Sequence, residues 1–284
     1  MSDNPGPPKF NEAKGFFWNW LYLFWEWVNN NMGRNFYFDV AAGLVNGHSS
    51  VNKFGANTNI ADGTEEVVWS GSGAYTFSTT ADITHIVSSS ASDNGKTVEI
   101  QGLDANWDLI VQDKVLGTPA TTGVALDTAL IRVFRMRFND AATNAGVVQC
   151  GVGAVTTAFT VGNLRAQMDI GFGQTLMAIY TVPAGKTAYM TKYYASIIGD
   201  PGPPARSPDY CIFRLYAADR ANGYAAQLKH AVGAAMVGTS LVEHEFLPAG
   251  PAGEKTDIYI SAQAEGDIAS VSAGFDLVVV DNQN

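Results

Sequence analysis

The stretch "NGKTVEIQ", residues 94–101, carries the pattern that decides the fold class. From Thr97 onward apolar and polar side chains alternate, which is typical of a β-strand with one buried and one solvated face. The preceding pair Asn94-Gly95 is the preferred sequence of a tight type I′ turn. The stretch therefore predicts a strand that is entered through a hairpin turn.

Similar short runs fill most of the chain. Residues 130–138 alternate in the same way, and residues 35–43, "NFYFDVAAG", are expected to begin the β pattern. Pro183-Ala184-Gly185 has the chemistry of a second hairpin turn, because proline presets φ and glycine accepts positive φ. Residues 225–236, "AAQLKHAVGAAM", fit either a strand pair or a short helix.

Many short strands without intervening helices predict a mainly β protein. We expect two antiparallel β-sandwich or jelly-roll-like units, preceded by a short N-terminal aromatic helix. The expected divisions are an arm and apolar anchor helix over 1–33, a first sandwich over 34–155 and a second over 156–284. The glycine-rich residues 150–163 are the expected join between the two sandwiches.

The N-terminal stretch "GFFWNWLYLFWEWVNNN", Gly15 to Asn31, holds four of the six tryptophans. Its apolar run, Phe16 to Val28, covers roughly 20 Å as a helix, whereas a bilayer core needs about 30 Å. A secretory signal is not expected either, since the segment before it mixes acidic and basic residues and no small-residue cleavage site follows.

On a helix, Asn19 and Glu26 lie on one narrow polar stripe, so this segment must be enclosed by something. We expect the enclosure to be other copies of the chain or another protein. A membrane surface and the chain's own core are the alternatives. The predicted anchor residues are Phe16, Phe17, Trp18, Trp20, Leu21, Leu23, Phe24, Trp25 and Trp27.

Composition narrows the classes of partner. The net charge is −10 and the pI is near 4.7, which argues against nucleic acid because phosphate contacts need clustered Lys and Arg. Cys150 and Cys211 are too few for a disulfide framework and are expected to be buried thiols.

No pattern of catalytic or metal-binding chemistry emerges. The histidines His48, His85, His230 and His244 lack metal-site spacing, and His244 is interpreted as a residue on a sheet surface. Asp104 and Asp108 flank Trp107, where carboxylates commonly form the hydrogen bonds of a turn. We therefore expect no enzyme activity, no cofactor and no metal.

Several segments together resemble a family of virion structural proteins of tailed bacteriophages, especially marine ones that infect cyanobacteria and other aquatic bacteria. The resemblance covers roughly residues 38–200 and implies a particle component, with no catalytic residue to carry over. The segments that carry it are Lys53-Phe54-Gly55, Trp69 to Phe77, Ser88 to Asp93, Gln101 to Trp107, Arg132 to Met136 and Tyr180 to Lys192.

The expected function is a non-enzymatic component of the virion, either a capsid decoration or cement protein or a head–tail or tail accessory protein. It would be assembled in the host cytoplasm, through the aromatic segment, as a closed oligomer, most simply a homotrimer, with other virion proteins. One alternative is a receptor- or glycan-binding fibre module, with Trp69, Tyr75, Trp107 and Tyr224 as candidate ligand contacts, although each is first expected in a core. A glycan-degrading enzyme that uses Asp104 and Asp108 is the remaining alternative.

Overall fold

The computed structural model describes residues 20–26, 35–71, 73–119, 121–199, 210–235 and 241–282. The chain divides into two compact units, Met1–Ser49 and Ser50–Asn284, and each is described here by itself.

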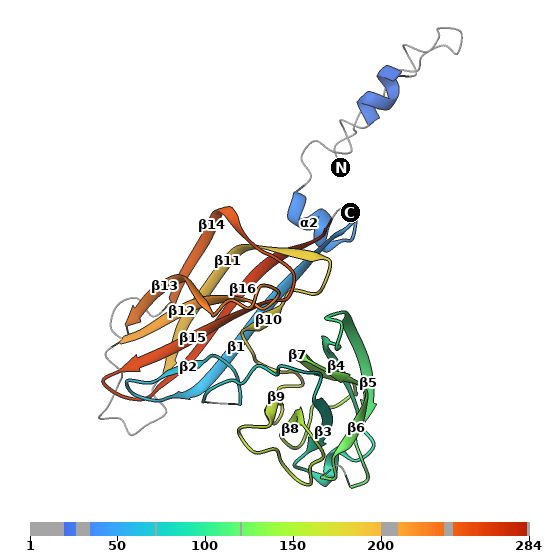
Figure 1. Ribbon diagram of the computed structural model, residues 1–284, viewed down its shortest axis with the longest axis vertical. Helices are drawn as coiled ribbons and strands as arrows, with labels where there is room; N and C mark the ends of the chain where they lie inside the picture. The colour runs from blue at the N-terminus through green and yellow to red at the C-terminus, as the bar shows by residue number, and fades with distance from the viewer. Residues whose placement is uncertain are drawn as a thin grey trace, which may run out of the picture. The chain divides into compact units, whose positions relative to one another are not determined.

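The described part of the N-terminal unit contains two short helices. One helix covers residues 20–26, and a second, α2, covers Phe36–Ala41 (Figure 1). The strand predicted from residue 35 onward is therefore wrong. The Asn35 side chain accepts a hydrogen bond from the backbone N–H of Tyr37 and caps the helix, and Asp39 in the first turn complements the helix dipole.

The larger unit contains four β-sheets. The first sheet has the strand order β1-β16-β11-β14, and β11 runs antiparallel to both of its neighbours. Its strands are β1 (His48–Ile60), β16 (Ala269–Asp281), β11 (Lys186–Gly199) and β14 (Leu241–Ala252).

The second sheet has the order β10-β15-β12-β13, with β2 also paired to β15. Its strands are β2 (Glu65–Val67), β10 (Ile179–Thr181), β12 (Tyr210–Asp219), β13 (Gln227–Ala235) and β15 (Thr256–Glu265). Residues 227–235 thus form one strand, which is neither the strand pair nor the short helix predicted for this stretch.

The third and fourth sheets have the orders β6-β3-β8-β9 and β5-β4-β7, and a short 3₁₀ turn, η1 (Ala91–Asp93), precedes β4. The strands of the third sheet are β3 (Ile83–Ser88), β6 (Val124–Leu130), β8 (Val148–Val152) and β9 (Leu164–Met168). Those of the fourth are β4 (Thr97–Leu103), β5 (Leu109–Val115) and β7 (Arg132–Phe138).

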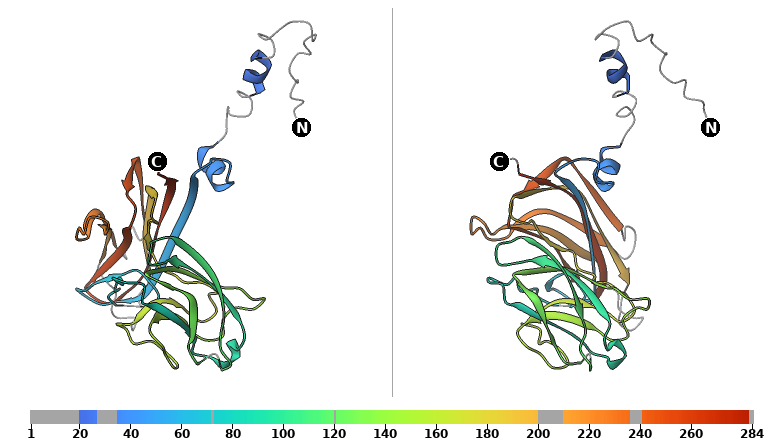
Figure 2. Two further views of the ribbon diagram at one scale, coloured as in Figure 1. Left: turned by 45° about the vertical axis from the view of Figure 1, so that its right-hand side comes forward. Right: turned by 90° about the vertical axis from the view of Figure 1, so that its right-hand side faces the viewer.

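Each pair of sheets encloses its own core. Tyr193, Phe213 and Phe275 belong to the first core, to which the first and second sheets contribute most residues. Ile100 and Met136 belong to the second core, which draws mainly on the third and fourth sheets. Figures 1 and 2 show β3 to β9, in green and yellow-green, as a group of strands apart from the orange and red strands. The predicted mainly β, antiparallel, sandwich-like class and the short N-terminal helix are confirmed.

The alternation of apolar and polar residues from Thr97 to Gln101 has the predicted effect. Val98 and Ile100 are fully buried in the second core, while Thr97, Glu99 and Gln101 between them are partly exposed. The residue types of β4 thus determine which face of the fourth sheet is turned inward.

The two turns predicted as hairpins instead carry the chain from one sheet to another. Asn94 has φ −52° and ψ 127° and Gly95 has φ +68°, which fits a type II turn rather than type I′. Its flanking strands, β3 and β4, lie in different sheets, as do β10 and β11 around Pro183-Ala184-Gly185. The glycine in each turn adopts the positive φ that the turn requires. The local sequence does not show which sheet the following strand joins.

The glycine-rich residues 150–163 run from the end of β8 to the start of β9. These two strands pair in the third sheet, with Val148 opposite Met168. Residue 155 is the expected end of the first sandwich, but strands that precede it also pair with strands that follow it. In the first sheet β1 pairs with β16, and in the second sheet β2 pairs with β15.

Candidate functional site

The N-terminal unit exposes large apolar side chains. On the helix of residues 20–26, Trp20 is 51% exposed, Leu23 62% and Phe24 47%. The rings of Trp20 and Phe24 stack with centroids 5.4 Å apart and planes at 6°, one helical turn from each other. The helix therefore presents an apolar, largely aromatic surface that the other described residues do not cover.

A polar contact lies on the same helix. The Tyr22 hydroxyl donates a hydrogen bond of 2.7 Å to the Glu26 carboxylate, and this bond raises the pKa of Tyr22. Leu21 and Trp25 are half-buried. The other predicted anchor residues, Phe16, Phe17, Trp18 and Trp27, lie outside the described residues.

Helix α2 adds three consecutive aromatic side chains. Phe36, Tyr37 and Phe38 are 49%, 54% and 76% exposed, whereas Val40 of the same helix is buried. The Phe36 ring contacts Tyr37 and His48 edge-on, at centroid distances of 5.7 and 5.9 Å. Sequence reasoning missed these residues as a surface because it treated them as part of a strand, although the "FYF" composition was a visible signal.

The four candidate ligand aromatics lie in different surroundings. Trp69 is 1% exposed and belongs to the second core, where its ring meets Tyr75 edge-on at 5.0 Å. Burial raises the pKa of Tyr75. Trp107 is half-buried, and its ring lies 4.9 Å from the Arg132 guanidinium carbon. Of the four, Tyr224 alone is strongly exposed, at 56%.

An ion pair is buried between β7 and β15. The Arg132 Nε and Nη2 atoms donate to the two carboxylate oxygens of Asp257 at 2.7 and 2.9 Å, and both side chains are almost fully buried. Thr181 and Arg220 donate to the same carboxylate at 2.7 and 2.8 Å. The rings of Phe77 and Trp107 lie against the Arg132 guanidinium. Both carboxylate oxygens of Asp257 are thus engaged in bonds that join strands.

Two other carboxylates, the buried Asp93 and the partly exposed Asp104, bond to the backbone. Asp93 accepts hydrogen bonds from the Ser88 hydroxyl and from the backbone N–H groups of Ala145 and Gly146, at 2.5, 2.8 and 2.9 Å. Asp104 accepts from the backbone N–H groups of Asn106 and Asp108, at 2.8 and 3.0 Å. The latter bonds form the turn that the sequence indicated at this position.

Two histidines that looked unrelated in sequence are stacked on one another. His230 of β13 and His244 of β14 have ring centroids 4.0 Å apart and planes at 22°, and Tyr193 and Phe246 contact both rings. Burial, and then the charge of His244, lower the pKa of His230. His244 is thus half-buried among aromatic rings on one face of its sheet, whereas its neighbours Glu243 and Glu245 are exposed.

Cys150 and Cys211 are free and buried, as predicted. Burial raises their pKa values, to about 12 for Cys150 and about 11 for Cys211. Because the thiolate is the reactive form, these residues serve as small apolar core side chains.

The described ranges contain neither a metal-binding cluster nor a membrane-spanning helix. No set of three or more His, Cys, Asp and Glu side chains there is grouped closely enough to hold a metal ion. In the same ranges, no helix combines the length and apolar character needed to cross a bilayer.

Comparison with known proteins places the chain in no family. No protein-family model matches it, and no curated protein matches it. A structure of infectious bursal disease virus, Gt strain, is similar over 82% of this chain and 72% of that chain, with 10% identity and a TM-score of 0.21. A likeness at this level carries no argument about fold or function.

Proposed function

We propose that the chain is a non-enzymatic structural component of a virus particle and that it assembles through its N-terminal aromatic segment. The observation that carries this proposal is the cluster of exposed apolar side chains in the N-terminal unit. Its described members are Trp20, Tyr22, Leu23, Phe24, Phe36, Tyr37, Phe38 and Leu44. Large apolar side chains that are exposed together on a short helix mark an interaction site.

The size of the cluster suits a protein partner. An aromatic side chain buries about 150–250 Å² when fully enclosed. If each of the six rings in the cluster buried half of this, the interface would gain roughly 600 Å² from rings alone, near the ~800 Å² per partner of a standard interface. We therefore propose a second copy of the chain or another virion protein as the partner, with a closed homotrimer as the simplest assembly.

The β body provides a rigid support in this proposal. Its buried carboxylates Asp257 and Asp93 are engaged in bonds that join strands or hold loop backbone, and the partly exposed Asp104 closes a turn. Such fixed internal networks favour a scaffold role and support the proposal that the protein is not an enzyme.

Some of the segments that resemble tailed-phage virion proteins contact one another inside this body. The Lys53 ammonium of β1 donates to the Phe134 carbonyl of β7, and Arg132 of β7 lies over Trp107. Three of the six resembling segments thus contact one another in pairs. The sequence resemblance itself supports a tailed-phage particle component as the finer proposal, located in the virion after assembly in the host cytoplasm.

The test replaces exposed apolar side chains with serine in the full chain. The variant W20S/L23S/F24S should lose self-assembly, or binding to purified particles, measured by light scattering and co-sedimentation. The matched control is V161S/I170S/F172S, whose side chains are 67%, 59% and 59% exposed on the body. If the first variant assembles like the unmodified chain, or if only the control loses assembly, the proposal is wrong.

A further inference from the structure

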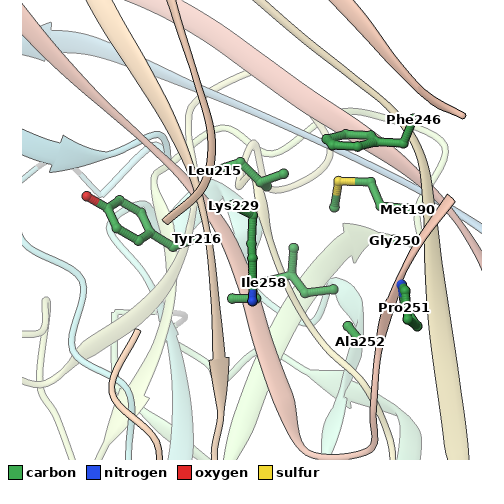
Figure 3. Close-up of a pocket in the computed structure, with 10 residues that line it drawn as sticks. Met190, Leu215, Tyr216, Lys229, Phe246, Gly250, Pro251, Ala252 and Ile258 are labelled. Carbon is green, nitrogen blue, oxygen red and sulfur yellow. The ribbon is translucent and has the colours of Figure 1, made fainter. Parts of the chain in front are cut away.

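A cavity opens on the body where the edge strands of the first and second sheets lie near each other. It has a volume of about 320 Å³ and receives residues from five strands (Figure 3). Its lining consists of Met190, Leu215, Tyr216, Ala217, Lys229, Phe246, Gly250, Pro251, Ala252 and Ile258. None of the residues assigned to the proposed assembly surface belongs to it.

Irregular pairing in both edge strands shapes the cavity. On β14, residues 246–249 face the single residue Thr191 of β11, because Met190 pairs with Gly250 and Lys192 with Glu245. On β13, Lys229 is an extra residue between the pairs Leu215–His230 and Tyr216–Leu228. Bulges of this kind bend a strand and redirect side chains, and they are frequent beside functional sites.

The chemistry of the lining selects a class of ligand. Apolar side chains dominate it, and Lys229 is the one charged residue among the ten. In the view of Figure 3, the Lys229 side chain extends between Leu215 and Ile258, while the Tyr216 ring points away from the other labelled side chains. The Lys229 ammonium also donates to the Gln227 side-chain oxygen at 2.9 Å, which holds it near its strand. An apolar cavity with one cation at its wall favours an apolar group that carries a negative charge.

We propose that this cavity binds a small amphiphilic anion, whose apolar part sits among Met190, Leu215 and Ile258 and whose carboxylate pairs with Lys229. A cavity of about 150 Å³ accepts one benzene ring, so this volume fits an apolar group of about two rings. The volume also lies at the small end of the range for ligand pockets, about 300–1,000 Å³.

The experiment titrates the full chain with 2-naphthoate and with its neutral analogue 2-naphthamide, using calorimetry. Saturable binding of 2-naphthoate is expected, at least tenfold tighter than that of 2-naphthamide. K229Q should weaken naphthoate binding about tenfold and leave naphthamide binding unchanged. The matched control K192Q removes a lysine of the neighbouring strand β11, whose ammonium pairs with Glu243 at 3.0 Å and which is not in the lining. It should bind like the unmodified chain.

A second variant tests the location by filling the cavity. A252F adds a ring where Ala252 lines the wall, and it should abolish binding of both ligands while circular dichroism shows the unmodified β signal. Absence of saturable binding to the unmodified chain, equal affinity for both ligands, or an equal effect of K229Q and K192Q would each overturn the proposal. Full binding by a folded A252F would overturn it as well.

Discussion

Arg132 and Asp257 are 125 residues apart in sequence and form a buried, bidentate ion pair, with N–O distances of 2.7 and 2.9 Å. The pair joins β7 of the fourth sheet to β15 of the second and therefore links the two sheet groups. Because Thr181 and Arg220 also bond to Asp257, loss of this carboxylate affects more than one contact.

We predict that D257N lowers the free energy of unfolding by about 3–5 kcal/mol, because it leaves the Arg132 guanidinium buried without its counter-ion. Urea unfolding at pH 7 measures the change. The double variant R132M/D257N should lose less than the sum of the two single variants, since it removes the orphaned charge. A loss below about 1 kcal/mol for D257N would contradict a linking role for the pair.

The buried Lys53 should make stability depend on pH. Burial, and then the charge of Arg135, lower the pKa of Lys53 from 10.5 to about 7. Between these values the unfolded chain binds more protons than the folded chain, so stability rises with pH from about 7 toward 10 and is lost as pH falls. Each pH unit within the window is worth up to about 1.4 kcal/mol.

The variant K53M should flatten this rise, as measured by urea unfolding at pH 7.0, 8.0 and 9.0. The matched control is K96M, because Lys96 is partly exposed and pairs with Asp140 at the surface. An equal pH dependence in K53M and in the unmodified chain would show that Lys53 does not titrate in this range.

The stacked pair His230 and His244 predicts a loss of stability in mild acid. The pKa of His230 is lowered below 6.5 in the folded chain, so the unfolded chain takes up a proton first as pH falls. The contribution of His230 to stability should therefore be complete above about pH 6.5 and decline below it. H230F keeps an aromatic ring against His244 and should decline less between pH 7.5 and pH 5.0, whereas the control H85Q should behave like the unmodified chain. Parallel declines in all three proteins would contradict this prediction.

Substitutions of Trp69 and Tyr224 distinguish an aromatic residue of the core from one that is exposed and free to contact a ligand. W69A should destabilise the protein by about 3–5 kcal/mol, because Trp69 fills the second core. Y224A should change stability by no more than about 0.5 kcal/mol, since its ring is exposed. A glycan array compares binding by the unmodified chain and Y224A. Glycan binding that Y224A abolishes would favour a receptor-binding module over the proposed structural role.

Sequence patterns predicted those features of the fold that depend on residues close together in the sequence. The alternation from Thr97 to Gln101 predicted which face of β4 is buried, and the isolated thiols were correctly expected in cores. The same local reasoning was wrong at residues 36–41, where the Asn35 cap favours a helix over a strand. A short aromatic stretch fits either element, so the capping bond decides it.

Long-range placement was not visible in sequence. The turns at Gly95 and Gly185 were recognisable, but the sheet that each following strand joins depends on contacts with distant strands. Likewise, His230 and His244 show no motif spacing, and their rings meet only because β13 and β14 are edge strands of two facing sheets. The cavity beside them depends on bulges, which the apolar pattern does not predict.

We propose that the N-terminal aromatic segment holds the protein in its assembly while the β body folds without it. Deletion of residues 1–33, followed by circular dichroism and light scattering, tests both parts in one preparation. We predict a folded, monomeric β body that fails to co-sediment with particles, whereas the full chain forms a closed oligomer and co-sediments. A truncated chain that assembles like the full chain, or one that precipitates unfolded, would contradict the claim.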